Sequence, residues 1–139
     1  MKTNPFSYSC WLLSKRDYSE KELRDKLKSK EVPEELIEKT ILKLKQYNYL
    51  NEDRFIESFL RTKKSKSNRA LIAGLQAKGI SSESSKAALV NLQGEEDRAY
   101  DLICKHADMD PDKLFKRLAY RGFSFESIKK ALKKRKESE

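Results

Sequence analysis

The sequence has little of the chemistry that most enzymes need. A single histidine, His106, excludes a multi-histidine metal site and leaves no convergent partners for a histidine-based triad. The four glycines, Gly74, Gly79, Gly94 and Gly122, are scattered and build no loop that would cradle phosphate. Acidic side chains mostly lie near Lys or Arg at spacings that helical ion pairs explain. We therefore expect no catalytic residue, no bound metal and no cofactor.

Cysteine and long apolar runs are also scarce. Cys10 and Cys104 have no metal-ligand or CxxC spacing, which favours two packed thiols in a reduced cytosolic protein. No apolar run approaches the length of a membrane span. Residues 1–13 lack the charged start and long apolar core of a secretory signal. We expect a cytoplasmic protein that does not enter the membrane.

Charge is what the chain has in excess. Hydrophobic residues make up 37% and charged residues 38%, with a formal net charge of +9. This balance indicates thin helical modules with small cores, because average globular chains are more apolar and less charged. The positive excess favours an anionic partner, although it is also compatible with a purely solubilising role. It is spread along the chain, with net charges of +3, +4 and +2 in residues 1–50, 51–94 and 95–139.

Three segments of the chain repeat one another without gaps. The copies align when started at Tyr8, Ile56 and Ala99, which are 48 and then 43 residues apart. A unit of this size cannot bury its apolar face alone, so neighbouring copies must stack. The sequence has no useful strand-like alternation. We predict an all-α fold of three tandem three-helix modules, 1–50, 51–94 and 95–139, stacked into an elongated and possibly curved array.

Capping and leucine patterns divide each module into three helices. The column before the second helix holds Ser19, Ser67 and Asp110, residue types that accept hydrogen bonds from the first turn. Ser19 and Glu22 form a capping box, and Pro111 suits the first helical position. The second helices bury leucine pairs at i, i+4 spacing: Leu23 and Leu27, Leu71 and Leu75, and Leu114 and Leu118.

The turn after each second helix recurs in all three modules. It contains Gly79 in the second module and Gly122 in the third, which predicts a left-handed residue that ends the helix. Glu31 occupies this column in the first module. The next residue, Val32, Ile80 or Phe123, is expected to fill the module core. The third helix of the second module, residues 81–92, has few large apolar residues, so we expect it to pack closely or to be weakly stable.

Basic residues gather before the second helices. Residues 61–69 hold five lysines and arginines, more than one helix end needs to complement its dipole. Lys15 and Lys105 need no explanation beyond that dipole. The C-terminal run at 129–136 is equally well explained as a solubilising cap.

Tandem trihelical modules with tight turns are also found in helix-turn-helix DNA readers. The third helices of the first two modules lack the Arg, Asn or Gln cluster that reads base edges, so contact with phosphates is easier to support. The aromatic residues offer no obvious stacking platform, because they occupy core-like columns: Trp11, Phe55, Phe59, Tyr100 and Phe123.

The chain resembles the RecX family of bacterial regulators of the RecA recombinase. The resemblance spans about residues 8–135 in module order, and four segments carry it: 16–27, 49–55, 75–80 and 121–124. Two departures concern loop geometry. The family commonly has glycines where this chain has residues 65–68, and Glu31 replaces a turn glycine.

The resemblance implies a non-enzymatic monomer that binds RecA and its filament on single-stranded DNA and mostly inhibits its ATPase, recombinase and coprotease activities. It gives no motif that assigns contacts. Charge and repeat position suggest eight contact residues: Lys63, Lys64, Lys66 and Arg69, followed by Lys15, Arg16, Arg117 and Arg121. We also expect weak binding to DNA through its backbone. Two alternatives remain open, namely a standalone DNA-binding protein that coats DNA and a helical scaffold for another protein.

Overall fold

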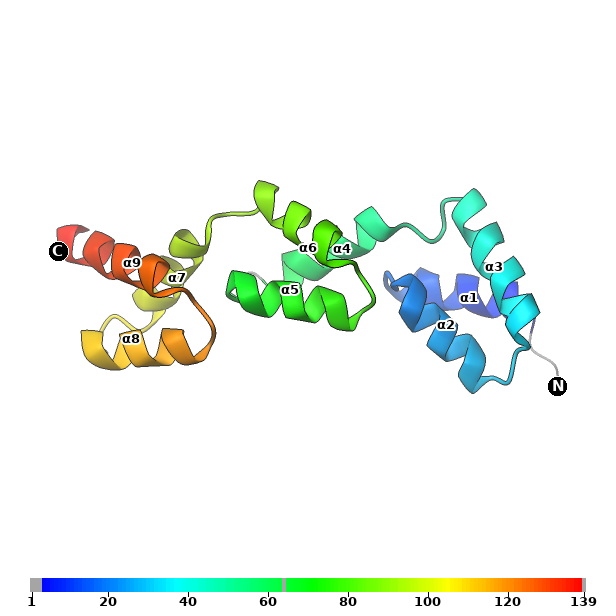
Figure 1. Ribbon diagram of the computed structural model, residues 1–139, viewed down its shortest axis with the longest axis horizontal. Helices are drawn as coiled ribbons and strands as arrows, with labels where there is room; N and C mark the ends of the chain where they lie inside the picture. Colours follow the sequence, from blue (N-terminus) through cyan, green and yellow to red (C-terminus); the bar gives the residue numbers. More distant parts are fainter. Residues whose placement is uncertain (1–3, 64, 139) are drawn as a thin grey trace. The chain divides into compact units, whose positions relative to one another are not determined.

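The computed structural model describes residues 4–63 and 65–138, and all regular structure in that part of the chain is helical (Figure 1). This confirms the all-α prediction. The elements are α1 (Pro5–Lys15), α2 (Glu20–Ser29), α3 (Glu34–Gln46), α4 (Glu52–Thr62), α5 (Asn68–Ala77), α6 (Ser82–Ala88), the 3₁₀ turn η1 (Leu89–Asn91), α7 (Glu95–Lys105), α8 (Pro111–Tyr120) and α9 (Phe125–Ser138).

The chain forms two compact units. The first comprises Met1–Phe59 with Ala77–Ile80, and the second comprises Leu60–Gln76 with Ser81–Glu139. Residues from α4 and from the α5–α6 turn therefore belong to the first unit, beside α1, α2 and α3. Module boundaries near residues 50 and 94 stay a prediction.

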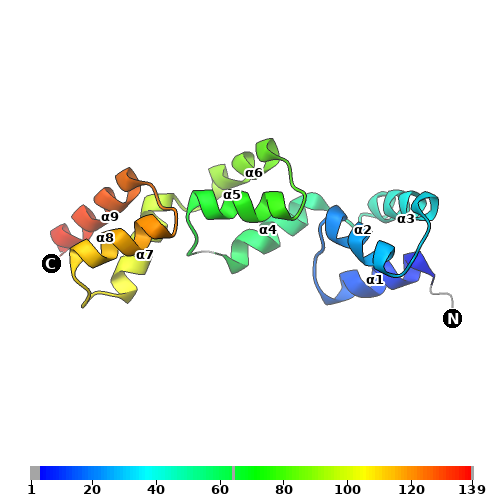
Figure 2. The ribbon, with the colours of Figure 1, turned by 60° about the horizontal axis from the view of Figure 1, so that its bottom comes forward.

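The core of the first unit forms where α1 and α2 pack against α3 (Figure 2). Leu23 and Leu27 of α2 are fully buried there, as the i, i+4 spacing predicts. Val32 is half-buried against the same core, which is the place that its column predicts. The remaining buried members are Leu12, Tyr18, Ile37, Ile41, Leu44 and Leu50.

The core of the second unit lies where α7 and α8 pack against α9. Leu114 and Leu118 of α8 are buried, as predicted, and Phe123 after the turn is 3% exposed. The other buried members are Ala99, Leu102, Ile103, Ile128 and Ala131. In α5 the leucine pair Leu71 and Leu75 is buried as well.

The poor apolar content of residues 81–92 is reflected in their structure. The α-helix there, α6, ends at Ala88 and continues only as the 3₁₀ turn η1. Its buried position is a serine, Ser85, whose hydroxyl donates to the Ser81 carbonyl at 2.7 Å. Val90 is 81% exposed. Little apolar area is available to hold a longer helix in this segment.

Caps begin the helices largely where the sequence predicts them. Ser19 accepts from the Glu22 amide at 3.2 Å while Glu22 accepts from the Ser19 amide at 3.1 Å, which completes the capping box. Ser67 accepts from the Ala70 amide at 3.1 Å. Asp110 is a correction, since it lies at the N-cap but its side chain makes no capping hydrogen bond.

The turns after α2, α5 and α8 share one backbone conformation. Gly79 and Gly122 have φ values of 88° and 96°, as their recurrence predicts. Glu31 adopts a φ of 60° in the same column although it is not glycine, and its side chain is exposed. The first turn therefore keeps the left-handed residue of the other two turns although it has no glycine.

Two expectations about single side chains were wrong. Trp11 is 56% exposed rather than core-like, although Leu12 beside it is buried in the core of the first unit. Cys104 is exposed, so packing does not explain it, whereas Cys10 is partly buried. Within the described residues, no helix combines the length and the apolar character required to cross a membrane.

Candidate nucleic-acid and protein interface

The loop between α4 and α5 carries the basic cluster that the sequence singles out. Lys63, Lys66 and Arg69 are all exposed, and Arg69 lies in the first turn of α5. Lys64, predicted as a fourth contact, lies outside the described residues. The backbone and the small polar residues of this loop make its contacts with the rest of the second unit.

The α8–α9 turn packs directly against this loop. Ser67 donates its hydroxyl to the Arg121 carbonyl at 3.1 Å. Gly122 is so close that a Cβ atom added there would lie 3.0 Å from the Ser67 hydroxyl and 3.6 Å from Cδ of Arg69. Arg69 and Arg121, which are far apart in sequence, are thereby brought to one place.

A buried arginine of α7 holds the same loop through hydrogen bonds. Arg98 is 2% exposed and donates from Nε to the Lys66 carbonyl at 2.9 Å. Its other nitrogens donate to the Asn68 side chain and to the Gln93 carbonyl. Burial lowers the pKa of Arg98, although nearby Glu95 opposes that shift. The guanidinium remains charged at neutral pH because its ordinary pKa is far higher.

Glu95 joins the loop to the turn. One of its carboxylate oxygens accepts from the Asn68 amide at 2.7 Å and the other accepts from the Ser124 amide at 3.0 Å. Burial opposes ionisation of this group. The hydrogen bonds from Ser124, Asn68 and Ser127 together outweigh that effect, so the pKa of Glu95 lies below its usual value. The ionised form is therefore part of the folded structure.

Replacing Glu95 with glutamine should destabilise the protein in a pH-dependent way. A carboxyl group whose pKa is lower in the folded state stabilises the fold above its unfolded-state pKa. That stabilisation disappears as the pH falls through the folded-state value. At pH 7 we expect a loss of about 1 kcal/mol in the free energy of unfolding, since one charge-assisted acceptor becomes neutral. The difference between the two proteins should shrink below pH ~4.

The measurement for Glu95 is urea unfolding followed by circular dichroism at several pH values. Glu96→Gln is the matched control, because Glu96 is the adjacent glutamate and is exposed. A stability difference between wild type and Glu95→Gln that stays constant down to pH ~3 would contradict the role of the ionised carboxylate.

Three cations lie where the α8–α9 turn meets the loop between α4 and α5, a contact called the second-unit joint below. Within residues 4–63 and 65–138, no carboxylate forms an ion pair with Lys66, Arg69 or Arg121. Arg117 is likewise exposed, and it precedes Arg121 by one turn at the end of α8. The structure thus brings together three of the predicted contacts with a fourth nearby. Such an arrangement can bind phosphate or an acidic protein surface without first breaking an internal ion pair.

The first unit contains the equivalent joint, built from residues that the sequence analysis missed. The columns of Arg69 and Arg121 hold Lys21 and Lys78 in the preceding repeat. Lys21 donates to the Ala77 carbonyl at 3.1 Å, and Lys78 lies 3.3 Å from the Glu22 carboxylate. The repeat alignment contained the signal for both lysines. Lys21 and Lys78 thus make their polar contacts within the first unit. Lys66, Arg69 and Arg121 of the second unit, by contrast, form no ion pair in the described part of the chain.

The two first-unit contacts predicted from charge are placed differently from each other. Lys15 ends α1, is exposed, and has its Nζ 5.7 Å from the centre of the Trp11 ring. Arg16 is bonded to Glu22 at 3.1 Å, and its guanidinium lies 3.7 Å from the Tyr18 ring centre. Arg16 is therefore a weaker candidate for binding a partner than Lys15.

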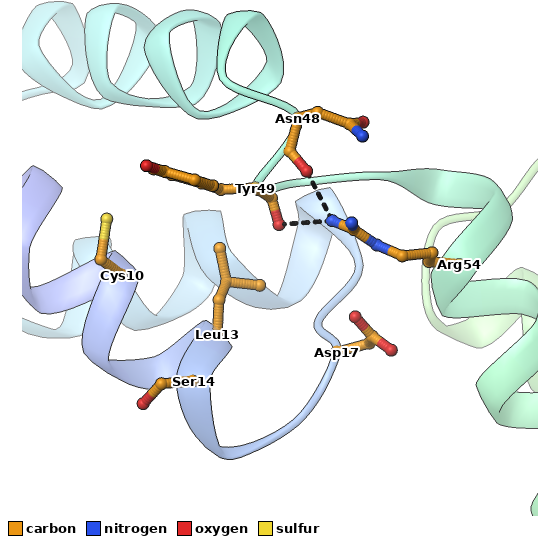
Figure 3. A pocket seen from close by; sticks show the side chains of 7 residues that line it. All are labelled: Cys10, Leu13, Ser14, Asp17, Asn48, Tyr49 and Arg54. Carbon is orange, nitrogen blue, oxygen red and sulfur yellow. Dashed lines mark hydrogen bonds between the residues drawn. The ribbon is translucent and has the colours of Figure 1, made fainter.

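A hollow of about 550 Å³ opens beside the segment that connects α3 to α4 (Figure 3). Arg54 reaches from α4 to donate to the carbonyl groups of Asn48 at 2.6 Å and Tyr49 at 3.1 Å. The remaining lining residues are Cys10, Leu13, Ser14 and Asp17. The arginine serves here to hold the connecting segment, and no histidine is present to activate the thiol or the hydroxyl.

Metal chemistry finds no support in the described part of the chain. Across residues 4–63 and 65–138, no group of three or more His, Cys, Asp or Glu side chains is arranged to hold a metal ion. The surface instead offers exposed, positively charged side chains beside hydrogen-bonded contacts, which suits binding of an anionic partner.

Comparison with known proteins agrees with this picture. Residues 6–44, which cover α2 and most of α1 and α3, match the family model described as RecX, first three-helix domain. The chain is 32% identical over 136 residues to a protein named Regulatory protein RecX from Clostridium beijerinckii, covering 88% of this chain and 64% of that protein. It is 31% identical over 140 residues to the protein of the same name from Bacillus subtilis, covering 91% of this chain and 53% of that protein.

These figures mean that the chain spans between half and two thirds of the length of those relatives. Among solved structures, RecX from Lactobacillus salivarius superposes with a TM-score of 0.81 at 22% identity, over 94% of this chain and 93% of that one. A second RecX structure gives a TM-score of 0.80, also at 22% identity, over 93% of this chain and 71% of that one. Both structures share the fold. The matching family model and the curated relatives show that this chain belongs to the RecX family.

Proposed function

We propose that this protein binds the RecA recombinase and its filament on single-stranded DNA, and that it mostly inhibits the ATPase, recombinase and coprotease activities of RecA. The curated relatives carry the name Regulatory protein RecX, which supports a regulatory role. In this role the protein catalyses no reaction of its own and acts in the cytoplasm as a monomer. It works by occupying the filament.

One observation carries the proposal, namely the set of exposed cations at the second-unit joint that lack acidic partners in the described structure. Lys66, Arg69 and Arg121 are held near one another by the Ser67 and Arg98 hydrogen bonds. A filament of protein on DNA offers both acidic surface and phosphates to such a cluster. Several weak contacts made by one chain raise the effective concentration of each, so the total affinity exceeds that of any single contact.

A second candidate is a standalone protein that coats DNA and restrains recombination in that way. The net charge of +9 favours it, since phosphate contacts supply most non-specific affinity. The two candidates differ in preference. A filament regulator binds the RecA filament more tightly than naked DNA, whereas a coating protein binds both alike. Titration of fluorescently labelled single-stranded DNA, with and without RecA, separates them.

Replacing Lys63, Lys64 and Lys66 together with alanine should weaken binding to the filament. If all three contact phosphates of a single strand, the slope of log affinity against log salt should flatten by about 2. Helicity should be unchanged, because the two described members of the set, Lys63 and Lys66, have exposed side chains. The measurement is filament binding by fluorescence anisotropy over a series of salt concentrations.

The matched control replaces Lys129, Lys133 and Lys136 of α9, which are also exposed, with alanine. It removes the same charge from a helix surface for which solubilisation is a sufficient explanation. Equal losses in the two triple variants would mean that only total charge matters, and would remove the loop from the binding site.

A further inference from the structure

An aromatic pair lies on the surface of α1. Trp11, the only tryptophan of the chain, is 56% exposed, and Tyr8 one turn earlier is half-buried. Their ring centres are 6.3 Å apart and their planes are inclined by only 20°. The two rings therefore present similarly oriented faces on one side of the helix.

The fold does not require an exposed tryptophan at this position. The same repeat column holds Phe59, which is half-buried, and Leu102, which is buried in the core of the second unit. In the first unit the core is filled without this ring, since Leu12 of the next column is buried there while Trp11 stays exposed. A large apolar ring that the core does not use, left in water, is a candidate for contact with a partner.

Two lysines from different helices accompany the rings. Lys15 Nζ lies 5.7 Å from the Trp11 ring centre, and Lys30 Nζ, at the end of α2, lies 5.6 Å from the Tyr8 ring centre. Both distances are within the range of about 6 Å over which a cation is attracted to a ring face. The two ammonium groups place positive charge at both ends of the aromatic pair.

Rings flanked by cations fit one class of partner best. Single-stranded nucleic acid offers base faces that stack on aromatic side chains and phosphates that pair with lysines, whereas a duplex keeps its base faces stacked internally. We propose that Trp11 and Tyr8, with Lys15 and Lys30, form a site on which a base of single-stranded DNA stacks while its phosphates contact the lysines.

This inference rests on the proposed function in one respect, since the filament is the expected source of the single strand. Its test uses naked DNA without RecA. Failure of the stacking site therefore leaves the regulatory role standing, and failure of the regulatory role leaves the stacking site measurable.

The test follows the fluorescence of Trp11, which is free of interference from any other tryptophan. The full chain is titrated with a thymidine oligomer of about 16 nucleotides, with an abasic oligomer of the same length and charge, and with a duplex. We expect saturable quenching by the thymidine oligomer, and little quenching by the other two at concentrations where anisotropy shows that they are bound.

Variants then measure what the ring contributes, with labelled DNA as the probe. Trp11→Leu, which introduces the residue that the third repeat has in this column, should weaken binding of the thymidine oligomer about tenfold. Trp11→Phe keeps a stacking ring and should restore most of the loss. The control is Phe125→Leu on α9, since Phe125 is 63% exposed and its ring contacts Phe115. It should leave affinity unchanged.

Three results would overturn the proposal. Equal quenching by the thymidine and abasic oligomers would mean that bases do not stack on the ring. Equal losses of affinity in Trp11→Leu and Phe125→Leu would mean that Trp11 contributes no more to binding than another exposed aromatic residue. Quenching by RecA protein alone, with none by single-stranded DNA, would make this surface a protein-docking site.

Discussion

Replacing Arg98 with alanine is expected to lower the free energy of unfolding by about 3 kcal/mol. Arg98 is 2% exposed, and it donates to the Lys66 carbonyl, the Gln93 carbonyl and the Asn68 side chain. Removing it leaves three partly buried acceptors without their donor and opens a cavity where the buried side chain lay. Because water reaches these acceptors only in part, much of the cost of desolvating them falls on the folded state.

The chain provides a matched control for Arg98. Arg54 also donates to two backbone carbonyl groups, those of Asn48 and Tyr49, but its side chain is exposed. Water can replace it, so Arg54→Ala should cost no more than about 1 kcal/mol. Urea unfolding followed by circular dichroism measures both variants. If Arg98→Ala proves no more destabilising than Arg54→Ala, the hydrogen bonds of the buried Arg98 do not stabilise the fold as described.

Loss of Arg98 should also affect binding. The Lys66 backbone and the Asn68 side chain both depend on it, and the loop between α4 and α5 with the first turn of α5 contributes Lys66 and Arg69 to the candidate interface. A loop that is less well ordered pays more conformational entropy when it binds. We therefore expect weaker filament binding by Arg98→Ala even under conditions where the protein remains folded.

Replacing Gly79 with alanine should cost about 2 kcal/mol of stability. Its φ of 88° is unfavourable for a residue with a side chain, and an added Cβ would lie 2.8 Å from the Cβ of Lys21. The first carbon of a side chain moves only with its backbone, so the contact is relieved only by shifting α2 or the turn. Both residues belong to the first unit, and the strain falls on its joint.

Gly94→Ala is the control for Gly79→Ala. An added Cβ at Gly94 would meet nothing closer than a carboxylate oxygen of Asp97 at 3.7 Å, an ordinary contact, and its φ is −56°. We expect a change within about 0.5 kcal/mol there. Thermal and urea unfolding of both variants decide the matter, and similar small effects in the two would show that the turn can move away from α2.

Much of the fold follows from local sequence signals. The capping box at Ser19, the buried leucine pairs and the left-handed turn residues all depend on residues close together in the chain, and all are present. The short α6 also follows from local composition. These features are predictable because their energies are determined within one or two helical turns.

The joints were not predictable in the same way. Arg98 follows three acidic residues at the start of α7, a pattern typical of an exposed helix start, and only the approach of the loop from another helix pair buries it. The positive φ of Gly79 and Gly122 is a local property, but their closeness to Lys21 and Arg69 is not. Trp11 shares a column with the buried Leu102, so the repeat pattern predicts a core residue there, and only the structure shows that the ring is exposed.

The candidate interface shows the same limit. Charge alone ranked Arg16 beside Lys15, and only the structure shows that Glu22 already pairs with Arg16. Charge and repeat position predict Arg69 and Arg121 as two separate contacts, and only the folded structure brings them close together. Net charge indicates what kind of partner to expect, whereas the partners of each side chain decide which residues are available to bind it.

The most direct test of the central proposal is the ATPase activity of RecA on single-stranded DNA, measured with increasing amounts of this protein. Binding of the protein to the same DNA without RecA is measured in parallel. The account predicts inhibition at protein concentrations that leave naked DNA almost unbound. Inhibition that begins only when naked DNA is saturated, or no inhibition at all, would contradict a regulator that acts on the filament.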